Sequence, residues 1–388
     1  MGELGKFYGG LSRKSKEDFK DGNAKFITYM NVFSNIALNL DVTGTVKISE
    51  CEKQNTIQYG DVLFTGSSET PDECGMSSVM TMKTDEKLYL NSFCFIYRFN
   101  NSELFLPAFS KYLFRSEYLR KQIIRIASGT TRFNLSKSQM SKLKIPVPPL
   151  DVQREIVRVL DNFTELIKEL KHELMLRKKQ YQYYRDYLLT FGDDVEWKTL
   201  GEIFEIKNGL NKEKSAFGKG KPIINFTDVY KNRWLNKDSF SGLVDVTPDE
   251  IERYKAKKGD VFFTRTSETK EDIGMVSTLI DNVSDCVFSG FVLRARPTTN
   301  LLIPKFCSYY FSTYNVRKQI IKQASFTTRA TITSKNLSKI NIPILPIEEQ
   351  ERIVKILDKC TELIELLKRE TELREKQYEY YRKKLLTF

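Results

Sequence analysis

Apolar residues recur in steps of four and three along two long segments of the chain, which is the spacing of a coiled-coil seam. The first seam comprises Ile156, Leu160, Phe163, Ile167, Leu170, Leu174, Arg177, Tyr181, Tyr184 and Leu188. The second comprises Ile353, Leu357, Cys360, Ile364, Leu367, Thr371, Arg374, Tyr378, Tyr381 and Leu385. Prolines before each seam, ending at Pro149 and Pro346, predict helix starts near Asp151 and Glu348. Each predicted helix covers about 40 residues, or roughly 60 Å.

The two seam-bearing segments are copies of one another. Residues 145–191 and 342–388 align without a gap, and 27 of the 47 aligned positions are identical. The spacing of the copies far exceeds the periods typical of solenoid repeats, so it indicates two whole domains, each followed by the same helix. Two seams in one chain most simply bury each other as an antiparallel pair. The alternative is that each helix lies on its own domain.

The segments before the helices predict two mixed domains. Short β-branched and aromatic runs indicate strands at 61–65, 93–99, 222–226, 261–264 and 286–294, and amphipathic patterns indicate helices at 107–126 and 304–323. The predicted fold class is α+β, with two pseudo-symmetric mixed α/β domains separated by two long helices that form an antiparallel coiled coil. The predicted boundaries are 1–149 for the first domain, 150–191 for its helix, 192–346 for the second domain and 347–388 for its helix.

The two globular domains match weakly, with small insertions. Both contain a Gly-Asp-Val run, beginning at Gly60 and Gly259, and both contain a Thr-Thr-Arg triplet, ending at Arg132 and Arg329. Alignment of the domain starts places Met1 opposite Leu200, so the first domain has no counterpart of residues 196–199. We therefore expect the first domain to lack an edge strand or an aromatic anchor.

Composition indicates a soluble globular protein. The chain has 388 residues, of which 40% are hydrophobic and 12% aromatic. No secretory signal, myristoylation site or apolar run of membrane-spanning length is present, which predicts a cytoplasmic protein with no membrane contact. The six cysteines include no Cys-x-x-Cys pair, so we expect reduced thiols and no bound metal.

The net charge of +12 lies almost entirely on the globular domains. Residues 150–191 carry 8 basic and 7 acidic residues, and 347–388 carry 10 of each, so the helices contribute only +1 and the domains +11. Such an excess suits a polyanionic partner, because each Lys or Arg that neutralises a phosphate releases a counterion. The alternative is that the basic charge only aids solubility.

The sequence offers little catalytic machinery. Its single histidine, His172, falls on the outer face of a predicted helix, which excludes catalytic sites that pair a nucleophile with histidine and excludes His-rich metal sites. No glycine-rich nucleotide-binding motif is present, so we expect no cofactor bound by this chain. Pro248-Asp249 with Glu268-Thr269-Lys270 formally fits a metal-dependent nuclease pattern. The alternative is that Pro248 opens a short helix.

Binding is therefore the expected activity, and the loops supply the candidate contacts. The Thr-Thr-Arg triplets combine hydroxyls with a guanidinium that grips phosphate or a guanine edge, although a structural role for these shared triplets is equally open. Base readout is better sought where the two domains differ. The candidate nucleic-acid contacts are Lys14, Ser67, Ser68, Thr130, Thr131 and Arg132 in the first domain, and Lys212, Arg233, Arg265, Ser267, Thr327, Thr328 and Arg329 in the second.

The chain, with its duplicated motifs in a fixed order, resembles the specificity subunit (HsdS) of type I restriction-modification enzymes. The resemblance rests on two dissimilar domains that each carry Thr-Thr-Arg, an Ile-Pro…Pro lead at Ile145 and Ile342, Gln-Arg-Glu-Ile or Gln-Glu-Arg-Ile at Gln153 and Gln350, and a long heptad helix. It implies two target recognition domains, each reading half of a split double-stranded DNA site. It also implies a non-catalytic chain, with S-adenosylmethionine, ATP and magnesium bound by two modification (methyltransferase) subunits and by restriction subunits.

The resemblance also suggests that the two helices act as a ruler, which would set the number of unread base pairs between the half-sites. Two rival interpretations exist. The chain could be an RNA-binding protein, although RNA readers usually display stacking aromatic motifs that the sequence does not show. It could also be a coiled-coil scaffold whose basic charge is incidental.

Overall fold

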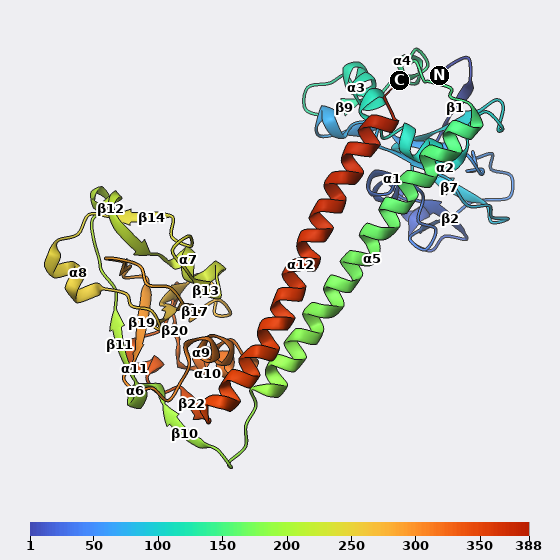
Figure 1. Cartoon of the computed structure of the whole chain (residues 1–388). Coiled ribbons are helices and arrows are strands. Elements are labelled where there is room, and N and C mark those ends of the chain that lie inside the picture. Colours follow the sequence, from blue (N-terminus) through green and yellow to red (C-terminus); the bar gives the residue numbers. More distant parts are fainter. Residues whose placement is uncertain (388) are drawn as a thin grey trace. The chain divides into compact units, whose positions relative to one another are not determined.

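The computed structural model describes residues 1–387 and divides into two compact units, each containing one globular domain and parts of both long helices (Figure 1). Unit 1 comprises Met1–Lys171 and the chain from Arg369 onward, and unit 2 comprises His172–Lys368. Phe388, the last residue of the predicted second helix segment, lies outside the described residues. The two units are described separately below.

Unit 1 is built on three small sheets. The main sheet has the strand order β1-β8-β4-β6, the second β3-β2-β7, and the third pairs β5 with β9. The strands are β1 (Gly5–Gly9), β2 (Ala24–Ile27), β3 (Gly44–Val46), β4 (Val62–Thr65), β5 (Ser67–Ser68), β6 (Ser77–Val79), β7 (Leu88–Leu90), β8 (Cys94–Phe99) and β9 (Phe133–Asn134). The helices of the globular part are η1 (Lys16–Phe19), α1 (Tyr29–Ser34), η2 (Pro71–Glu73), α2 (Pro107–Leu113), α3 (Glu117–Ile126) and α4 (Lys137–Met140).

Unit 2 repeats this topology and adds to it. Its main sheet has the order β11-β19-β15-β17-β13, its second β14-β12-β18, its third β16-β21-β20, and β10 pairs with β22. The strands are β10 (Glu196–Thr199), β11 (Phe204–Asn208), β12 (Phe217–Ile224), β13 (Trp234–Leu235), β14 (Gly242–Val244), β15 (Val261–Thr264), β16 (Thr266–Ser267), β17 (Val276–Leu279), β18 (Val287–Phe288), β19 (Val292–Pro297), β20 (Ser325–Phe326), β21 (Ala330–Thr331) and β22 (Asn341–Ile344). The helices are α6 (Leu200–Ile203), η3 (Lys214–Ala216), α7 (Phe226–Lys231), α8 (Pro248–Tyr254), α9 (Pro304–Phe311), α10 (Tyr314–Gln323) and α11 (Ser334–Leu337).

The central strand of each main sheet is buried on both faces, which explains its unbroken apolar sequence. In β15, Val261 and Phe263 belong to the core that contains α9 and α10, whereas Phe262 belongs to a second core on the other face. The first domain divides in the same way, with Phe64 facing one core and Leu63 the other. Because strand side chains alternate between faces, two cores require apolar residues at every position.

Most predicted strands are confirmed, and the exceptions occur where a turn interrupts a run of apolar residues. The run 61–65 corresponds to β4, 93–99 to β8 and 261–264 to β15. The run 286–294 is divided between β18 and β19 by Ser289-Gly290-Phe291, because the chain turns there. The run 222–226 ends in β12, and the helix α7 begins at Phe226.

The two predicted amphipathic helices were wrong in one respect, since each is a pair of shorter helices. Residues 107–126 form α2 and α3, and 304–323 form α9 and α10. At the break in the first pair, the Ser116 hydroxyl accepts a hydrogen bond from the Leu119 amide and caps α3. At the second, Thr313 occupies the N-cap and its hydroxyl donates to the Tyr310 carbonyl. The Ser116 side chain thus caps the start of the second helix of its pair, whereas the Thr313 side chain bonds back to the end of the first helix of its pair.

The two long helices are confirmed as α5 (Leu150–Leu188) and α12 (Ile347–Leu385), each of 39 residues. They begin one residue before the predicted starts. Within unit 1 the helices are antiparallel: the Phe163 ring stacks on Tyr381 with centroids 5.4 Å apart, and Lys171 forms an ion pair of 2.7 Å with Glu375. The partner number falls from 381 to 375 as the α5 number rises, as antiparallel pairing requires.

The predicted seams are buried partly between helices and partly on the globular domains, so both alternatives hold over part of their length. In unit 1, Ile156 and Leu160 are buried in the domain core together with Leu386 from the end of α12. In unit 2, Tyr181, Ile353 and Leu357 belong to the domain core. Between these ends Thr371 is buried, and the other predicted seam positions are half-buried: Phe163, Ile167, Leu170, Leu174, Arg177, Cys360, Ile364, Leu367, Arg374 and Tyr378.

Tyr184 was wrongly assigned to the seam. It is 41% exposed, and its ring contacts the neighbouring Tyr183 instead of the core. Four residues after the buried Tyr181, Arg185 is half-buried, and Leu189 is buried in the core. A heptad pattern repeats every 3.5 residues, whereas a straight α-helix has 3.6 residues per turn. On a helix that does not supercoil, successive heptad positions therefore rotate away from the core. Tyr381, the equivalent in α12, is 40% exposed but stacks on Phe163.

A buried glutamine joins the start of each long helix to its domain. The amide nitrogen of Gln153 donates to the carbonyls of Leu104 and Pro148 at 3.0 and 2.9 Å, and its carbonyl oxygen accepts from the Leu106 amide at 2.9 Å. Gln350 makes the same three bonds with Leu301, Leu345 and Ile303 at 2.7, 2.9 and 2.9 Å. This duplicated arrangement explains why glutamine occurs at both positions of the repeat.

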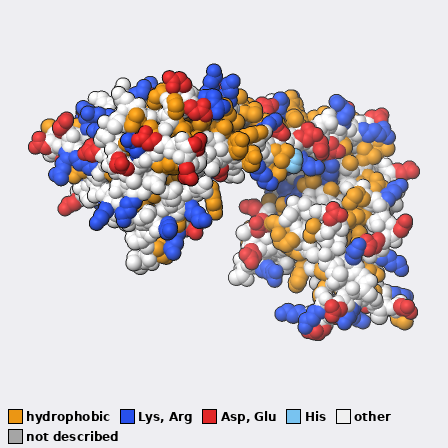
Figure 2. Space-filling view, turned by 90° about the horizontal axis from the view of Figure 1, so that it is seen from below, with side chains coloured by type: hydrophobic (Ala, Val, Ile, Leu, Met, Phe, Trp, Pro, Cys, Tyr) orange, Lys and Arg blue, Asp and Glu red, His pale blue; other side chains and the backbone are white. Residues whose placement is uncertain are grey.

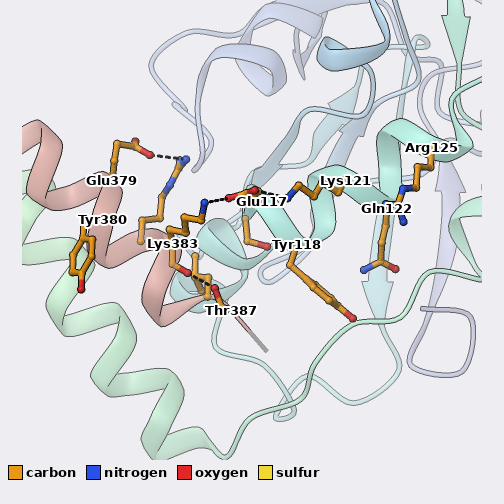
Figure 3. Close-up of a pocket in the computed structure, with 12 residues that line it drawn as sticks. Glu117, Tyr118, Lys121, Gln122, Arg125, Glu379, Tyr380, Lys383 and Thr387 are labelled. Carbon is orange, nitrogen blue, oxygen red and sulfur yellow. Dashed lines mark hydrogen bonds and ion pairs between the residues drawn. The ribbon is translucent and has the colours of Figure 1, made fainter.

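In unit 1 the last turns of α12 lie against α3 and enclose a polar groove of about 640 Å³ (Figure 3). Glu117 accepts from Lys121 on its own helix at 2.5 Å and from Lys383 on α12 at 3.2 Å. On α12, Arg382 is paired with Glu379 at 2.9 Å. The pair between Lys383 and Glu117, together with the burial of Leu386, holds the end of α12 on the domain.

Unit 2 has an additional strand pair that the described residues of unit 1 do not show. In unit 2, β10 pairs with β22 and places Trp197 opposite Pro343. In unit 1, no described strand pairs with the equivalent segment 144–147. Met1 is buried there, and its amino group donates to the Leu143 carbonyl at 2.6 Å, as the Leu200 amide does to Ile340 at 2.8 Å.

Candidate nucleic-acid interface

The two Thr-Thr-Arg triplets lie at the tips of short hairpins. In unit 1 the hairpin is closed by reciprocal backbone hydrogen bonds between Ser128 and Asn134 at 3.1 and 2.9 Å. In unit 2 it is formed by β20 and β21, with Ser325 paired to Thr331. The triplet residues Thr130, Thr131, Arg132, Thr327, Thr328 and Arg329 are all exposed. The hydroxyls and guanidinium groups are thus available to a partner.

A phenylalanine beside each triplet is exposed, which the sequence analysis missed. Phe93 is 58% exposed, and the Arg132 guanidinium lies 5.8 Å from the centroid of its ring. Phe291 is 59% exposed and lines the same cavity as Arg329. Both residues fall within runs that predicted strands. The available signal was a turn residue shortly before each phenylalanine: Asn91 precedes the run 93–99, and Gly290 interrupts the run 286–294.

Each unit also places a stacked aromatic pair on a short helix. Tyr29 and Phe33 of α1 stack with centroids 6.0 Å apart, and Phe226 and Tyr230 of α7 stack at 5.6 Å. In unit 2, Phe226 and Tyr230 line a cavity of about 370 Å³ together with Ser267, Phe291 and Arg329. One face of the second domain therefore combines aromatic rings, hydroxyls and a guanidinium.

The tyrosines of these pairs remain neutral hydrogen-bond donors. The Tyr29 hydroxyl donates to the Ser67 carbonyl at 2.8 Å, and burial raises its pKa above the ordinary value. The Tyr230 hydroxyl donates to Asp272 at 3.2 Å, and this bond to a carboxylate raises the pKa of Tyr230. Each hydrogen bond links a short helix to the strand or loop that follows the central strand of its sheet.

The candidate serines are buried, which corrects their assignment as freely exposed contacts, and only Ser267 lines the cavity described above. Ser67 and Ser68 form β5, which pairs with β9, and both are buried. The Ser68 hydroxyl donates to Glu73 at 3.3 Å. In unit 2, Ser267 is buried and its hydroxyl accepts from the Thr269 amide at 3.3 Å. Because β5 and β16 pair with the hairpin strands, these serines position the exposed triplets.

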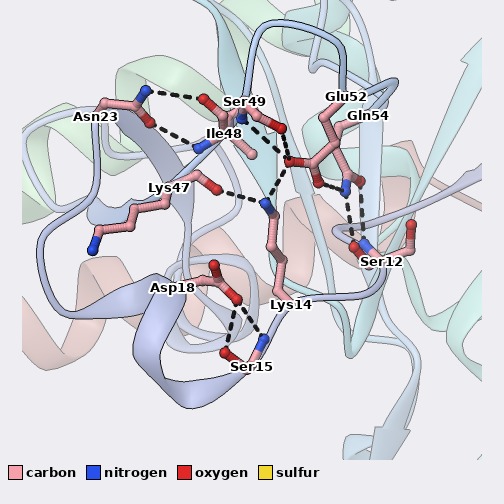
Figure 4. A network of polar contacts seen from close by, with 10 residues as sticks. All are labelled: Ser12, Lys14, Ser15, Asp18, Asn23, Lys47, Ile48, Ser49, Glu52 and Gln54. Atoms are coloured by element: carbon pink, nitrogen blue, oxygen red, sulfur yellow. Dashed lines mark hydrogen bonds and ion pairs between the residues drawn. The ribbon is translucent and has the colours of Figure 1, made fainter.

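Lys14 is engaged within its own domain, which also corrects its assignment (Figure 4). Its side chain is only 8% exposed, and the ammonium donates to the Lys47 carbonyl at 2.5 Å and to Glu52 at 2.6 Å. The hydrogen bonds from Lys14 and then Gln54 lower the pKa of Glu52 to about 2. The charge of Lys14 therefore fastens the loop that follows β1 to the segment 47–54.

Arg233 is likewise structural, although it was predicted to bind nucleic acid. Its guanidinium lies 5.1 Å from the Tyr181 ring and 4.9 Å from the Tyr309 ring, and it donates to the Thr361 hydroxyl at 3.0 Å. All these partners belong to unit 2, and two of them belong to the long helices. Arg233 therefore holds the domain to the helices.

The last two cationic candidates are partly engaged. Lys212 pairs with Glu250 at 2.8 Å, and both side chains are about one quarter exposed. Arg265 donates from one guanidinium nitrogen to the Gly290 carbonyl at 3.2 Å. Its Nε atom is buried and has no hydrogen-bond partner within residues 1–387. Arg265 therefore supports the turn that carries Phe291, and Lys212 retains some exposure.

Lys and Arg side chains do not gather into one continuous patch on the face shown in Figure 2, where Asp and Glu lie among them. Many of the basic residues are already paired with acidic partners, as at Lys14, Lys212 and Lys305. The basic residues on this face are thus dispersed among acidic ones instead of forming a single patch.

The nuclease-like motif forms no cluster. Pro248 opens α8 after the cap Thr247, as the alternative interpretation predicts. The Lys270 ammonium lies 5.0 Å from the Phe326 ring. No group of three His, Cys, Asp or Glu side chains in residues 1–387 is placed to hold a metal ion. The six cysteines are free thiols, and four of them are buried.

The fold defines a class of protein with two copies of one α+β domain, each presenting an arginine hairpin and joined to two long helices. The chain belongs to the family described as the type I restriction modification DNA specificity domain, which matches residues 1–176 and 192–374. Both copies of the domain and most of both helices fall within the two matches.

The chain is similar to several curated specificity subunits. It is 36% identical over 275 residues to the EcoR124I/EcoR124II specificity subunit of Escherichia coli, an alignment that covers 65% of this chain and 65% of that relative. It is 24% identical over 382 residues to the putative MjaX specificity subunit of Methanocaldococcus jannaschii, which covers 90% of this chain and 83% of the relative. The first alignment thus spans slightly less than two thirds of its relative.

Solved structures share the fold. The HsdS subunit from Thermoanaerobacter tengcongensis has a TM-score of 0.55 at 19% identity, covering 98% of this chain and 95% of that one. The S subunit from M. genitalium has a TM-score of 0.52 at 15% identity, covering 100% and 95%. Separately, the helices within residues 1–387 include none with the length and apolarity needed to cross a bilayer.

Proposed function

We propose that this chain is the sequence-specific DNA-binding specificity subunit of a type I restriction-modification system. Each unit binds one half of a bipartite, asymmetric target in double-stranded DNA. The observation that carries the proposal is the presence of two faces on one fold, which share an exposed arginine hairpin but differ in the side chains around it. The family description, a DNA specificity domain, agrees with this assignment.

The shared and the differing residues would have different tasks. Arg132 and Arg329, which are exposed in both copies, bind phosphate and position the domain on the duplex. The short helices α1 and α7 differ in their exposed side chains, with Met30 and Ser34 on the first and Thr227 and Lys231 on the second. Base contacts from these helices would give each domain its own half-site.

The partners are proposed from the same family. Two modification (methyltransferase) subunits and the restriction subunits would dock on this chain and carry the chemistry, binding S-adenosylmethionine, ATP and magnesium. The chain itself would be non-catalytic. Exposed apolar side chains on the long helices, such as Leu166, Leu363 and Leu366, support a docking role for the helices.

The equal lengths of α5 and α12 support a role in setting the spacer between the half-sites. Deletion of one heptad from each helix at equivalent positions should change the number of unread base pairs and preserve both half-site sequences. An unchanged spacer in the methylation map of such a variant would rule out the ruler.

The decisive experiment is methylated-base sequencing of DNA from cells that express this chain with its methyltransferase subunit. We expect methylation at a single split motif. Replacing the exposed residues of α1 with those of α7 should change only the half of that motif that the first domain reads. Absence of any motif, with normal assembly of the complex, would contradict the proposed function and favour a scaffold.

A further inference from the structure

One exposed phenylalanine lies at the same place in each unit, directly before the second strand of the main sheet. Phe93 precedes β8, and Phe291 precedes β19. Their exposed fractions, 58% and 59%, are nearly equal. Leaving a large apolar ring in water forfeits the free energy of burying it, and here the same exposure occurs twice.

Each ring is carried by a backbone that is fixed from two sides. The Phe93 amide donates to the Asn91 side chain at 2.9 Å, and its carbonyl accepts from the Gly66 amide at 2.7 Å. In unit 2, the Phe291 amide donates to the Ser289 hydroxyl at 3.2 Å, and its carbonyl accepts from the Arg265 amide at 2.9 Å. These backbone hydrogen bonds therefore hold each ring in its exposed position.

Each ring also lies beside the arginine that we assign to phosphate. Arg132 covers one side of the Phe93 ring, and Arg329 lines the same cavity as Phe291. A domain that docks with its arginine on a phosphate brings the neighbouring ring against the duplex. The same residue in both domains cannot account for two different half-sites, so its contact with DNA must be independent of base identity.

We propose that Phe93 and Phe291 are wedges that insert between adjacent base pairs and partly unstack one step in each half-site. Rigid apolar side chains beside basic residues are the means by which proteins unstack and bend DNA. The insertion removes the ring from water, which offsets the burial free energy forfeited in the free protein. The wedge reads no base, so it favours any step that unstacks easily, and this preference is the same in both half-sites. This inference rests on the proposed function.

The test uses the complex of the full chain with its methyltransferase subunits, bound to the target found by methylated-base sequencing. Duplexes carry 2-aminopurine at successive steps of one half-site, because its fluorescence rises when the base unstacks. We expect a rise at one step in each half-site. Phe93→Ala should abolish the rise in one half-site only and Phe291→Ala in the other only, so each variant serves as the control for its counterpart.

Affinity provides the second measurement. Each alanine variant should bind the target about tenfold more weakly, and Phe93→Leu and Phe291→Leu should retain most of the affinity and the fluorescence rise, since leucine also serves as a wedge. Unchanged fluorescence in the alanine variants would overturn the wedge. A second outcome would also overturn it: the alanine variants bind DNA more weakly, but the unmodified complex shows no rise in fluorescence. The rings would then contact only the groove or the sugars.

Loss of assembly with the methyltransferase in the alanine variants would reassign the rings to a protein contact and likewise overturn the wedge. Failure of the unmodified complex to bind any duplex would instead contradict the proposed function. Circular dichroism melting should be the same for all variants, because neither ring packs in a core.

Discussion

The two units share a buried framework and differ at the surface loops, and this contrast separates the residues that fold the protein from those that can select a target. Asp61 and Arg98 form a two-bond ion pair at 2.7 and 2.7 Å, and Asp260 and Arg296 form its copy at 2.8 and 2.7 Å. By contrast, the pair between Lys14 and Glu52 in unit 1 has no equivalent at the same place in unit 2, where the lysine of the first loop pairs with α8.

The junction between helix and domain shows that the framework conserves bonds more strictly than it conserves every residue that makes them. Asp161 and Asp358 accept from equivalent tyrosines, Tyr112 and Tyr309, at 2.5 and 2.7 Å. Each aspartate also pairs with a lysine at 2.7 Å, but Lys111 and Lys305 occupy different positions on their helices. Both copies therefore place a positive charge beside this aspartate, but the lysine that supplies it occupies a different position in each sequence.

The largest expected effect comes from breaking the shared ion pair inside the sheet. Asp61→Ala and Asp260→Ala should each destabilise their unit by about 3–5 kcal/mol, because each removes a buried carboxylate with the hydrogen bonds that it accepts and leaves a guanidinium that is only about one quarter exposed without its partner. The measurement is urea unfolding followed by a fluorescence probe in each unit. A loss below about 1 kcal/mol in either unit would show that the framework is not equivalent in the two copies.

The next effect tests the junction glutamines. Gln153→Leu and Gln350→Leu should each cost roughly 3 kcal/mol, since three hydrogen bonds are lost and buried backbone groups remain unpaired. Gln182→Leu, at an exposed position on α5, is the matched control and should change stability by less than about 0.5 kcal/mol. If Gln182→Leu and Gln153→Leu changed the stability equally, the hydrogen bonds of Gln153 would not contribute to the stability of the junction.

The arginine hairpins should affect DNA binding more than stability. Arg132→Ala and Arg329→Ala should each weaken binding about tenfold and lower the slope of log affinity against log salt by about one, as expected for one lost phosphate contact. The loss should be equal for target and random duplexes in quantitative gel-shift titrations. A loss confined to the target would assign the arginine to base readout and make the two hairpins different in function.

The smallest expected effect comes from the ion pair between Lys14 and Glu52, which only unit 1 contains. The pKa of Glu52 is depressed to about 2 from an ordinary value of 4.5, so its pairing stabilises the fold above about pH 4.5 and is lost as the pH falls through about 2. Glu52→Gln should therefore flatten the decline of the urea midpoint between pH 5 and pH 2. The exposed Glu50→Gln is the control for loss of one acidic charge. The same decline in Glu52→Gln and in the unchanged protein would contradict the pairing.

Sequence patterns sufficed for the elements that repeat with a regular period. The helix starts, most of the seam and the duplicated α+β architecture follow from apolar spacing and from the aligned copies. The breaks at Ser116 and Thr313 escaped prediction, because an apolar stripe continues across both helices and only the capping bonds reveal the stop. Tyr184 was misplaced because a heptad pattern assumes a supercoiled partner along the whole helix.

The interface was harder to predict, because residue type does not show which way a side chain faces. The triplets drew attention because both copies carry them, and the structure shows that they are exposed. Lys14 and Arg233 were chosen for their charge, but partners distant in sequence engage both, Glu52 in one case and Thr361 in the other. Phe93 and Phe291 were overlooked because an exposed aromatic residue inside an apolar run resembles an ordinary core residue until the turn is seen.

The division of the helices between the units has a consequence for the order of folding during synthesis. Unit 2 is one continuous stretch of chain, His172–Lys368, whereas unit 1 requires the chain from Arg369 onward, including the buried Leu386, to complete its core. Domains generally fold as they leave the ribosome, the earlier one first. Here the domain that is translated first has to wait for the last residues, so the second domain can finish folding before the first.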